Sequence, residues 1–166
     1  FLPTGPINFI ISQILGRTFL FAWVATESTA FLVLIITDVW HWTPLMFLIL
    51  FSGMVALPQN PIRAARVLGA SGWQIFWGLK MPMLKAVILL AIAIRAMEAM
   101  KFFDEIYIIT GGGPGFSTET FSFEVYLQAL RYFSLGYSAA QAIIILLITV
   151  VLIYFLLRPA LRMARE

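Results

Sequence analysis

The sequence contains no cysteine and few charged residues, and each of these shortages narrows the possibilities. Without cysteine there is no disulfide or thiol chemistry, and the redox compartment is not indicated. Only 11% of the 166 residues are charged, whereas 61% are hydrophobic, and the mean hydropathy is +0.95. A soluble domain of this size is about half apolar and about a quarter charged. The excess of apolar side chains therefore predicts a protein of the lipid bilayer.

The apolar residues are grouped into three windows that reach the roughly 20 residues a membrane-spanning helix needs. These windows predict an all-α membrane protein with transmembrane helices at residues 29–57, 83–109 and 137–158. Residues 1–28 are expected to be an extracytoplasmic or interfacial segment, with one interfacial helix over residues 7–23. The chain begins with Phe1 and not with Met, so we expect it to be a piece of a longer protein.

The basic residues predict the orientation, because cytoplasmic segments carry an excess of Lys and Arg. The connection 58–82 and the start of the next window contain four basic residues and no acid. The tail 159–166 is also basic, whereas the segment 110–136 has Arg131 as its single basic residue. Both basic segments should therefore face the cytoplasm, and the segment 110–136, expected to hold a loop and a short helix, should lie outside.

The cytoplasmic connection 58–82 predicts two short helices that lie under the membrane. Asn60 is expected to cap the first helix, and Gly69 to end it. Ser71 is expected to cap the second. From this pattern alone, an ordinary amphipathic loop and a docking site for a partner are equally compatible with the residues.

Several stretches resemble one family of membrane proteins. The run "AARVLGASGWQIFWGLKMP" is similar to the EAA loop, the cytoplasmic coupling helix of permease subunits in binding-protein-dependent ABC importers. The runs "DVWHWTPLMFLILFSGMVALP", "FFDEIYIITGGGPGFST" and "LGYSAAQAIIILL" resemble the sugar-permease branch, in particular the larger maltose-type subunit. The resemblance covers about residues 30–158. It implies three helices of a type I importer core, preceded by further helices.

The resemblance also implies which residues couple the permease to its ATPase. The positions in register with the EAA loop are Arg63, Ala64, Ala65, Gly69, Leu79, Met81 and Pro82. Two positions depart from the family pattern, because Arg63 stands where the loop glutamate is usual and Leu68 where an aspartate is usual. Either the cognate ATPase supplies a compensating acid, or the partner permease carries the normal loop.

The implied assembly contains a second permease, two copies of a cytoplasmic ATPase and an extracytoplasmic solute-binding protein in a bacterial or archaeal cytoplasmic membrane. The resemblance implies a sugar or polyol as the solute, and a charged sugar is one member of that class. The chain has no phosphate-binding Gly-x-x-x-x-Gly-Lys-Ser/Thr, so it should not itself be an enzyme or bind a cofactor, and ATP would act on the partner subunit. No catalytic residue, metal site or nucleic-acid partner is expected.

Polar side chains within the predicted spans are the candidates for solute binding, because charge at bilayer depth is costly and usually faces a cavity or another charge. Helical spacing places them on one stripe in each of the first two spans, and relatives of the maltose type have sugar contacts at the corresponding positions. The candidates are Asp38, His41, Trp42, Leu45, Arg95, Glu98 and Phe102. Lys101 and Glu105 are expected to form a surface pair at i, i+4 spacing.

Structural alternatives stay open for these residues. A structural ion pair between Arg95 and Glu98 is equally compatible with the sequence, and so is a role of Asp38 and His41 in capping or bridging helices. Trp42 is expected either to stack on a sugar ring or to anchor the helix at the membrane interface. A different function is also compatible with the residues, namely a secondary transporter or channel with Asp38, His41 and Glu98 as a proton relay. An intramembrane enzyme with His41 and Asp38 as a base pair is the least favoured, because no nucleophile accompanies them.

Overall fold

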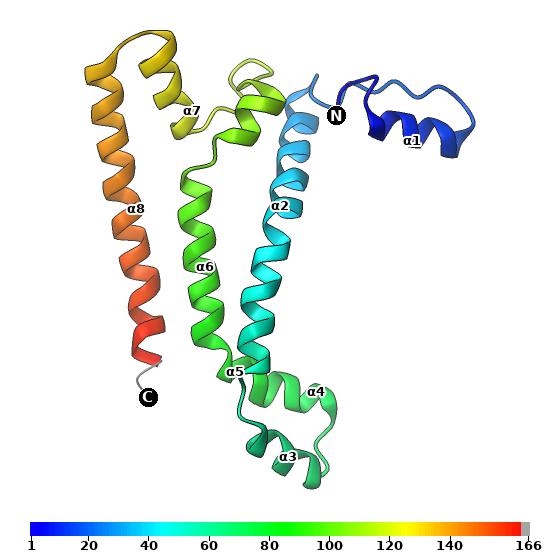
Figure 1. Ribbon diagram of the computed structural model, residues 1–166, viewed down its shortest axis with the longest axis vertical. Coiled ribbons are helices and arrows are strands. Elements are labelled where there is room, and N and C mark those ends of the chain that lie inside the picture. Colours follow the sequence, from blue (N-terminus) through cyan, green and yellow to red (C-terminus); the bar gives the residue numbers. More distant parts are fainter. Residues whose placement is uncertain (164–166) are drawn as a thin grey trace. The chain divides into compact units, whose positions relative to one another are not determined.

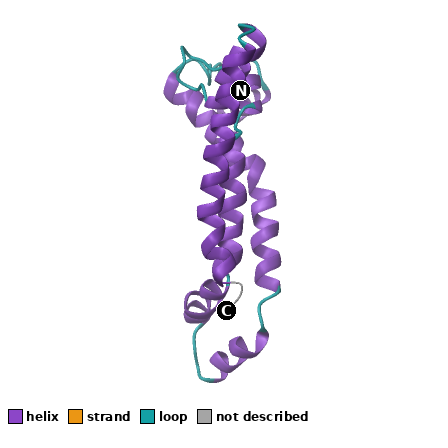
Figure 2. Ribbon diagram, turned by 90° about the vertical axis from the view of Figure 1, so that its left-hand side faces the viewer, coloured by secondary structure: helices purple, strands orange, loops and turns teal. Residues whose placement is uncertain are grey.

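The computed structural model describes residues 1–163 of the protein, with side chains up to Arg158. In this part of the chain every regular element is a helix and there is no strand (Figure 2). The all-α prediction is therefore confirmed. Of the expected tail 159–166, the last three residues lie outside the described part.

The elements follow one another as long helices and short helical turns (Figure 1). They are α1 (Pro6–Leu15), α2 (Glu27–Val55), α3 (Gln59–Val67), α4 (Gly72–Ile75), η1 (Phe76–Lys80), α5 (Met81–Met83), α6 (Lys85–Met100), η2 (Ile106–Thr110), α7 (Phe121–Tyr126), η3 (Leu127–Arg131) and α8 (Leu135–Met163). The three η elements are π-helical turns. The chain divides into two compact units. The first unit comprises Phe1–His41 and Met100–Leu146, and the second comprises Trp42–Ala99 and the chain from Leu147 on.

The long apolar helices agree with the predicted spans in two cases of three. Helices α2 and α8 are each long and apolar enough to cross a membrane. Helix α6 has only 16 residues and qualifies only together with the preceding helical segment Gly72–Met83, from which it is bent by 63°. The prediction of one continuous helix over residues 83–109 was wrong, because α6 ends at Met100 and the chain is non-helical at Phe102 and Phe103.

Side chains from the segment after η2 stabilise this break. The Thr120 hydroxyl donates a hydrogen bond to the Phe102 carbonyl at 2.8 Å, and the Ser122 hydroxyl donates to the Met100 carbonyl at 3.0 Å. The Thr120 oxygen also accepts from the Phe123 amide and so caps α7. These bonds satisfy carbonyls that the interrupted helix would otherwise leave bare.

The core of the first unit surrounds the same break. Its buried members are Leu34 from α2, Ile106 from η2, Phe123 from α7 and Leu127 from η3. Phe102, Phe103 and Tyr126 pack against them.

The N-terminal segment is organised by one buried amide. Asn8 is 1% exposed, donates to the carbonyls of Pro3 and Phe21, and accepts from the Trp23 indole nitrogen at 2.7 Å. The expected helix over 7–23 is correspondingly shorter, because Gly16 adopts a left-handed φ of 64° after α1 and the rest of the segment returns along Asn8.

The second unit packs the connection 58–82 onto the ends of α2 and α6. Its core consists of Leu57, Ile62, Ile75 and Leu84. At Gly53 of α2, an added Cβ would lie 2.8 Å from a methyl carbon of Val87 in α6. The absence of a side chain at this position therefore allows the two helices to approach closely.

We expect Gly53→Ala to destabilise the protein in detergent. A β-branched neighbour cannot move a methyl group aside by rotating freely, and overpacking costs about 1–3 kcal/mol. Gly136→Ala is the matched control, since Gly136 is also helical but has nothing within 4 Å of the new methyl. The measurement is the thermal unfolding midpoint of both variants. Equal midpoints for the two would contradict the close approach.

Candidate functional site

Four candidate residues lie in the continuous helix α2. Asp38 and Trp42 are half-buried, whereas His41 and Leu45 are exposed. Pro44 lies inside the helix without ending it. The helical spacing assumed for these four positions is therefore present in the structure.

His41 contacts Glu105 within the first unit. Its Nδ1 lies 2.9 Å from Oε1 of Glu105, and the two side chains are 61% and 15% exposed. The contact joins α2 to the short helical segment that follows the break after Met100. The i, i+4 spacing predicted Lys101 as the partner of Glu105. That spacing places two residues on one face only in a continuous helix, and the helix is interrupted between Lys101 and Glu105.

Arg95 and Trp42 form the corresponding contact of the second unit. The guanidinium carbon of Arg95 in α6 lies 5.3 Å from the centre of the Trp42 ring in α2. This is a cation–π distance, and such contacts contribute about 0.5–1 kcal/mol at exposed sites and about 2 kcal/mol when desolvated. Trp42 was expected to stack on a sugar or to anchor at the interface, and the structure gives one of its faces to Arg95.

Phe102 does not continue the stripe of Arg95 and Glu98. It lies in the break beyond the end of α6, and it packs against the core of the first unit. The expected i, i+3, i+7 face was therefore wrong at its third member. Asp38, His41 and Phe102 belong to the first unit, and Trp42, Leu45, Arg95 and Glu98 belong to the second.

The cytoplasmic connection has the two expected helices, α3 and the α4–η1–α5 segment. Ser71 caps α4 through a capping box, since its hydroxyl accepts from the Gln74 amide and the Gln74 side chain accepts from the Ser71 amide at 2.8 Å. Gly69 has a φ of +82°, as expected for a helix stop. The Asn60 cap was wrong: Pro58 precedes α3, and no side chain caps it.

The coupling residues divide between a packed and an exposed set. Ala65 and Leu79 pack against the core of the second unit, whereas Arg63 and Ala64 on α3 are exposed. Met81 and Pro82 open α5, where proline needs no backbone donor. Helix α3 therefore has an exposed side that carries Arg63 and a buried side that packs against the core of the second unit.

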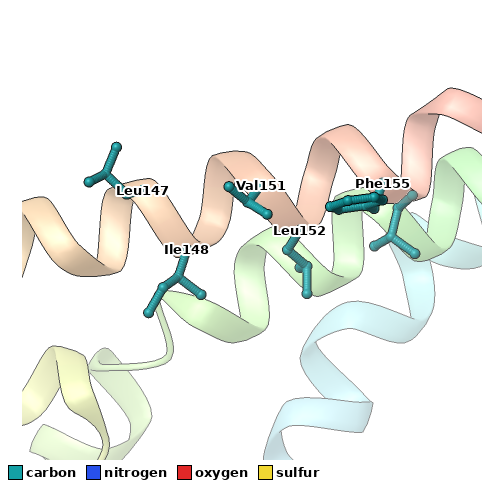
Figure 3. A pocket seen from close by; sticks show the side chains of 6 residues that line it. Leu147, Ile148, Val151, Leu152 and Phe155 are labelled. Atoms are coloured by element: carbon teal, nitrogen blue, oxygen red, sulfur yellow. The ribbon is translucent and has the colours of Figure 1, made fainter.

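An apolar groove lies along the second half of α8 (Figure 3). Its lining consists of Leu147, Ile148, Val151, Leu152, Phe155 and Leu156. It offers no hydrogen-bonding group to a hydroxylated solute, so it is not the solute site. Among residues 1–163, no three His, Asp or Glu side chains gather as metal ligands.

One carboxyl of the segment between η2 and α7 has a shifted pKa. Burial raises the pKa of Glu119 above its ordinary value, and the negative charge of Glu124 raises it further. Glu119 also borders the turn at Gly112, where an added Cβ would lie 2.9 Å from the Glu119 side chain.

The comparison with known proteins identifies the family. The family model described as "binding-protein-dependent transport system inner membrane component" matches residues 5–163. The chain belongs to this family. It is therefore a multi-pass protein of the cytoplasmic membrane.

Several curated relatives of this inner membrane component are named as permeases for a sugar or a sugar derivative. The trehalose/maltose transport system permease protein MalF of Thermococcus litoralis is 41% identical over 149 residues, which are 89% of this chain and 48% of the relative. The sulfoquinovosyl glycerol transport system permease protein SmoG of Agrobacterium fabrum is 32% identical over 74% of this chain and 40% of the relative. The trehalose transport system permease protein SugA of Mycobacterium tuberculosis is 34% identical over 68% of this chain and 36% of the relative. The chain spans about half or less of the length of these relatives.

We expect a small but measurable coupling energy between His41 and Glu105. Because the His41 side chain is 61% exposed, a double-mutant cycle with His41→Ala and Glu105→Gln should give up to about 1 kcal/mol. The measurement is the unfolding free energy in mixed detergent. A parallel cycle with Lys101→Ala and Glu105→Gln is the control, and a larger coupling there would contradict the observed pairing.

Proposed function

We propose that this inner membrane component is a permease subunit of an ATP-driven ABC importer that moves a sugar or a polyol into the cell. The observation that carries the proposal is the family match over residues 5–163. The trehalose and trehalose/maltose permeases among the relatives support a saccharide as the solute class. The sulfoquinovosyl glycerol permease supports a charged sugar derivative as an alternative of the same class.

The proposed assembly includes a second permease, two ATPase subunits and an extracytoplasmic binding protein. ATP hydrolysis takes place on the partner subunits, and this chain supplies no catalytic residue or cofactor. The connection 58–82 passes the motion of the ATPases to α2 and α6. Its packing supports this role, because Ile62 of α3 and Leu84 before α6 share one buried core with Leu57. A displacement of α3 therefore moves the helix ends as well.

The exposed part of this connection is the proposed contact with the ATPase. Arg63 and Ala64 lie on the exposed side of α3, with Gly69 at its end. In this chain Arg63 presents a positive charge, so the complementary surface of the ATPase carries an acid. Ala65 and Leu79 pack against the core that holds α3 in place, and Met81 and Pro82 are proposed to couple as part of α5, which leads toward α6.

The proposed solute contacts are the polar and aromatic side chains of α2, α6 and the following break, namely Asp38, His41, Trp42, Leu45, Arg95, Glu98 and Phe102. The half-buried positions of Asp38, Trp42, Arg95 and Glu98 support this role. Carboxylate and guanidinium groups form strong charge-assisted hydrogen bonds with hydroxyls. The cation–π contact holds the Arg95 guanidinium against the Trp42 ring, and a guanidinium has five N–H donors in all.

Uptake by the full-length protein with its partners should require ATP inside proteoliposomes and should not require a proton gradient. The measurement is accumulation of labelled trehalose, maltose and a polyol, with binding protein outside the vesicles. An uncoupler and a non-hydrolysable nucleotide are the two controls. Uptake that continues without ATP and stops with the uncoupler would replace the importer by a proton-coupled transporter.

We expect Gly69→Val to reduce the amount of solute moved per ATP hydrolysed. The space around Gly69 is open, so the cost comes from its φ of +82°, a conformation that a β-branched residue does not adopt readily. The end of α3 should then reposition while solute binding is unchanged. Gly72→Val is the control, because Gly72 also has open space but no positive φ. An unchanged transport-to-ATP ratio in Gly69→Val would show that α3 does not transmit the motion.

A further inference from the structure

The segment formed by α4 and η1 has two different sides. Ile75 and Leu79 point into the core of the second unit. Trp73 and Trp77 point away from it and are 72% and 51% exposed. Two exposed tryptophan rings give this short segment a large apolar surface that the core of the second unit does not cover.

The exposed rings form one continuous surface with Phe76. The ring centres of Trp73 and Trp77 are 5.6 Å apart, and those of Phe76 and Trp77 are 5.4 Å apart. Trp73 also stacks on Phe76 at 6.5 Å. Edge-to-face and stacked contacts at these distances hold aromatic rings in a fixed arrangement. We call Trp73, Phe76 and Trp77 the aromatic surface.

The aromatic surface lies next to the point where the chain enters the bilayer. The segment Gly72–Met83 is bent by 63° from α6, so it runs aside from the axis of that helix (Figure 1). An amphipathic helix with aromatic side chains on one face and basic residues beside them lies along the membrane surface, and the bend separates the part of the segment that carries the rings from α6. Tryptophan has its strongest preference for this interfacial depth, because its ring is apolar and its N–H is polar.

The charge around the aromatic surface has one sign. No Asp or Glu occurs between Asp38 and Glu98, whereas Arg63, Arg66, Lys80 and Lys85 lie in this stretch. Lys80 ends η1 and is half-buried, and Lys85 begins α6 and is exposed. A basic cluster immediately cytoplasmic of a membrane-spanning helix attracts anionic lipid headgroups.

We propose that the aromatic surface, with Lys80 and Lys85, binds the anionic phospholipids of the inner leaflet. The rings insert at the headgroup boundary, and the two ammonium groups contact lipid phosphates. This surface is separate from the exposed side of α3 that is proposed to meet the ATPase. The lipid contact fixes the level of η1 and α5 against the membrane while α3 is free to move with the ATPase.

Depth measurements on the assembled full-length importer in nanodiscs test the position of the rings. Because this chain has no cysteine, Trp77→Cys introduces one labelling site in it for a nitroxide, and Phe116→Cys, 82% exposed in the segment between η2 and α7, provides the control. We expect the label at position 77 to collide more with oxygen than with a water-soluble nickel chelate, and the label at position 116 to do the reverse. Preference for nickel at both positions overturns the proposal. Shielding of position 77 from both reagents also overturns it and shows that a protein partner covers the rings.

Lipid selectivity tests the charges without altering the rings. The probes are spin-labelled phosphatidylglycerol and phosphatidylcholine, and the quantity is the relative amount of each that is immobilised by the protein. Removing both charges with Lys80→Gln and Lys85→Gln should lower the preference for phosphatidylglycerol by at least about twofold. Arg17→Gln, an exposed charge of the N-terminal segment, should leave it unchanged. Equal preference in the double variant and the wild type overturns the proposal, and neither result depends on whether solute is transported.

Discussion

The two hydroxyl hydrogen bonds at the break after Met100 are the constraint on which the first unit depends. A helix that stops inside an apolar stretch leaves carbonyl groups that lipid cannot satisfy. Thr120 and Ser122 supply the missing donors from the segment that precedes α7 and from α7 itself. As a result the chain can turn at Phe102 and Phe103, place Ile106 in the core, and bring Glu105 to His41. The hydrogen bonds that stabilise the break therefore also position the segment after it, whose Glu105 contacts His41 of α2.

Hydropathy predicts the long helices of this chain and cannot predict that break. Residues 101–109 contain Lys101, Asp104 and Glu105 and are less apolar than α6, but charges of this kind do not by themselves end a helix. The stabilising donors stand about twenty residues further along the sequence, so the position of the break could not be read from the local pattern. The ion pair of His41 with Glu105 was missed for the same reason, since the rule that suggested Lys101 assumes an unbroken helix. Phe102 and Phe103 at the break, and Thr120 and Ser122 near α7, are residue types that occur in many other contexts, so they do not specifically predict a break in the helix.

Capping could be predicted where both partners are local. Ser71 and Gln74 stand three residues apart, and both halves of their capping box are formed. Gly69 was recognisable because a helix stop needs a conformation that glycine adopts easily. Asn60 failed as a cap because the helix begins one residue before it, at Gln59, after the turn set by Pro58. The buried role of Asn8 was equally invisible, since its partners are two carbonyls and an indole from other parts of the N-terminal segment.

Residues 58–85 contain two proposed contact surfaces, one for the ATPase and one for the membrane. The first lies on α3, and the second lies on α4, η1 and the start of α6. The proposed ATPase contact requires an exposed α3, and Arg63 and Ala64 are exposed. The proposed membrane contact requires an apolar, basic surface, which Trp73, Trp77, Lys80 and Lys85 can supply. The shared core of Leu57, Ile62, Ile75 and Leu84 connects the two. Because side chains in such a core are close-packed, we expect a displacement of α3 to act on the ends of α2 and α6 as well. If the proposed lipid contact holds η1 at constant depth, that displacement becomes a rotation about η1, which would tilt the helices it joins.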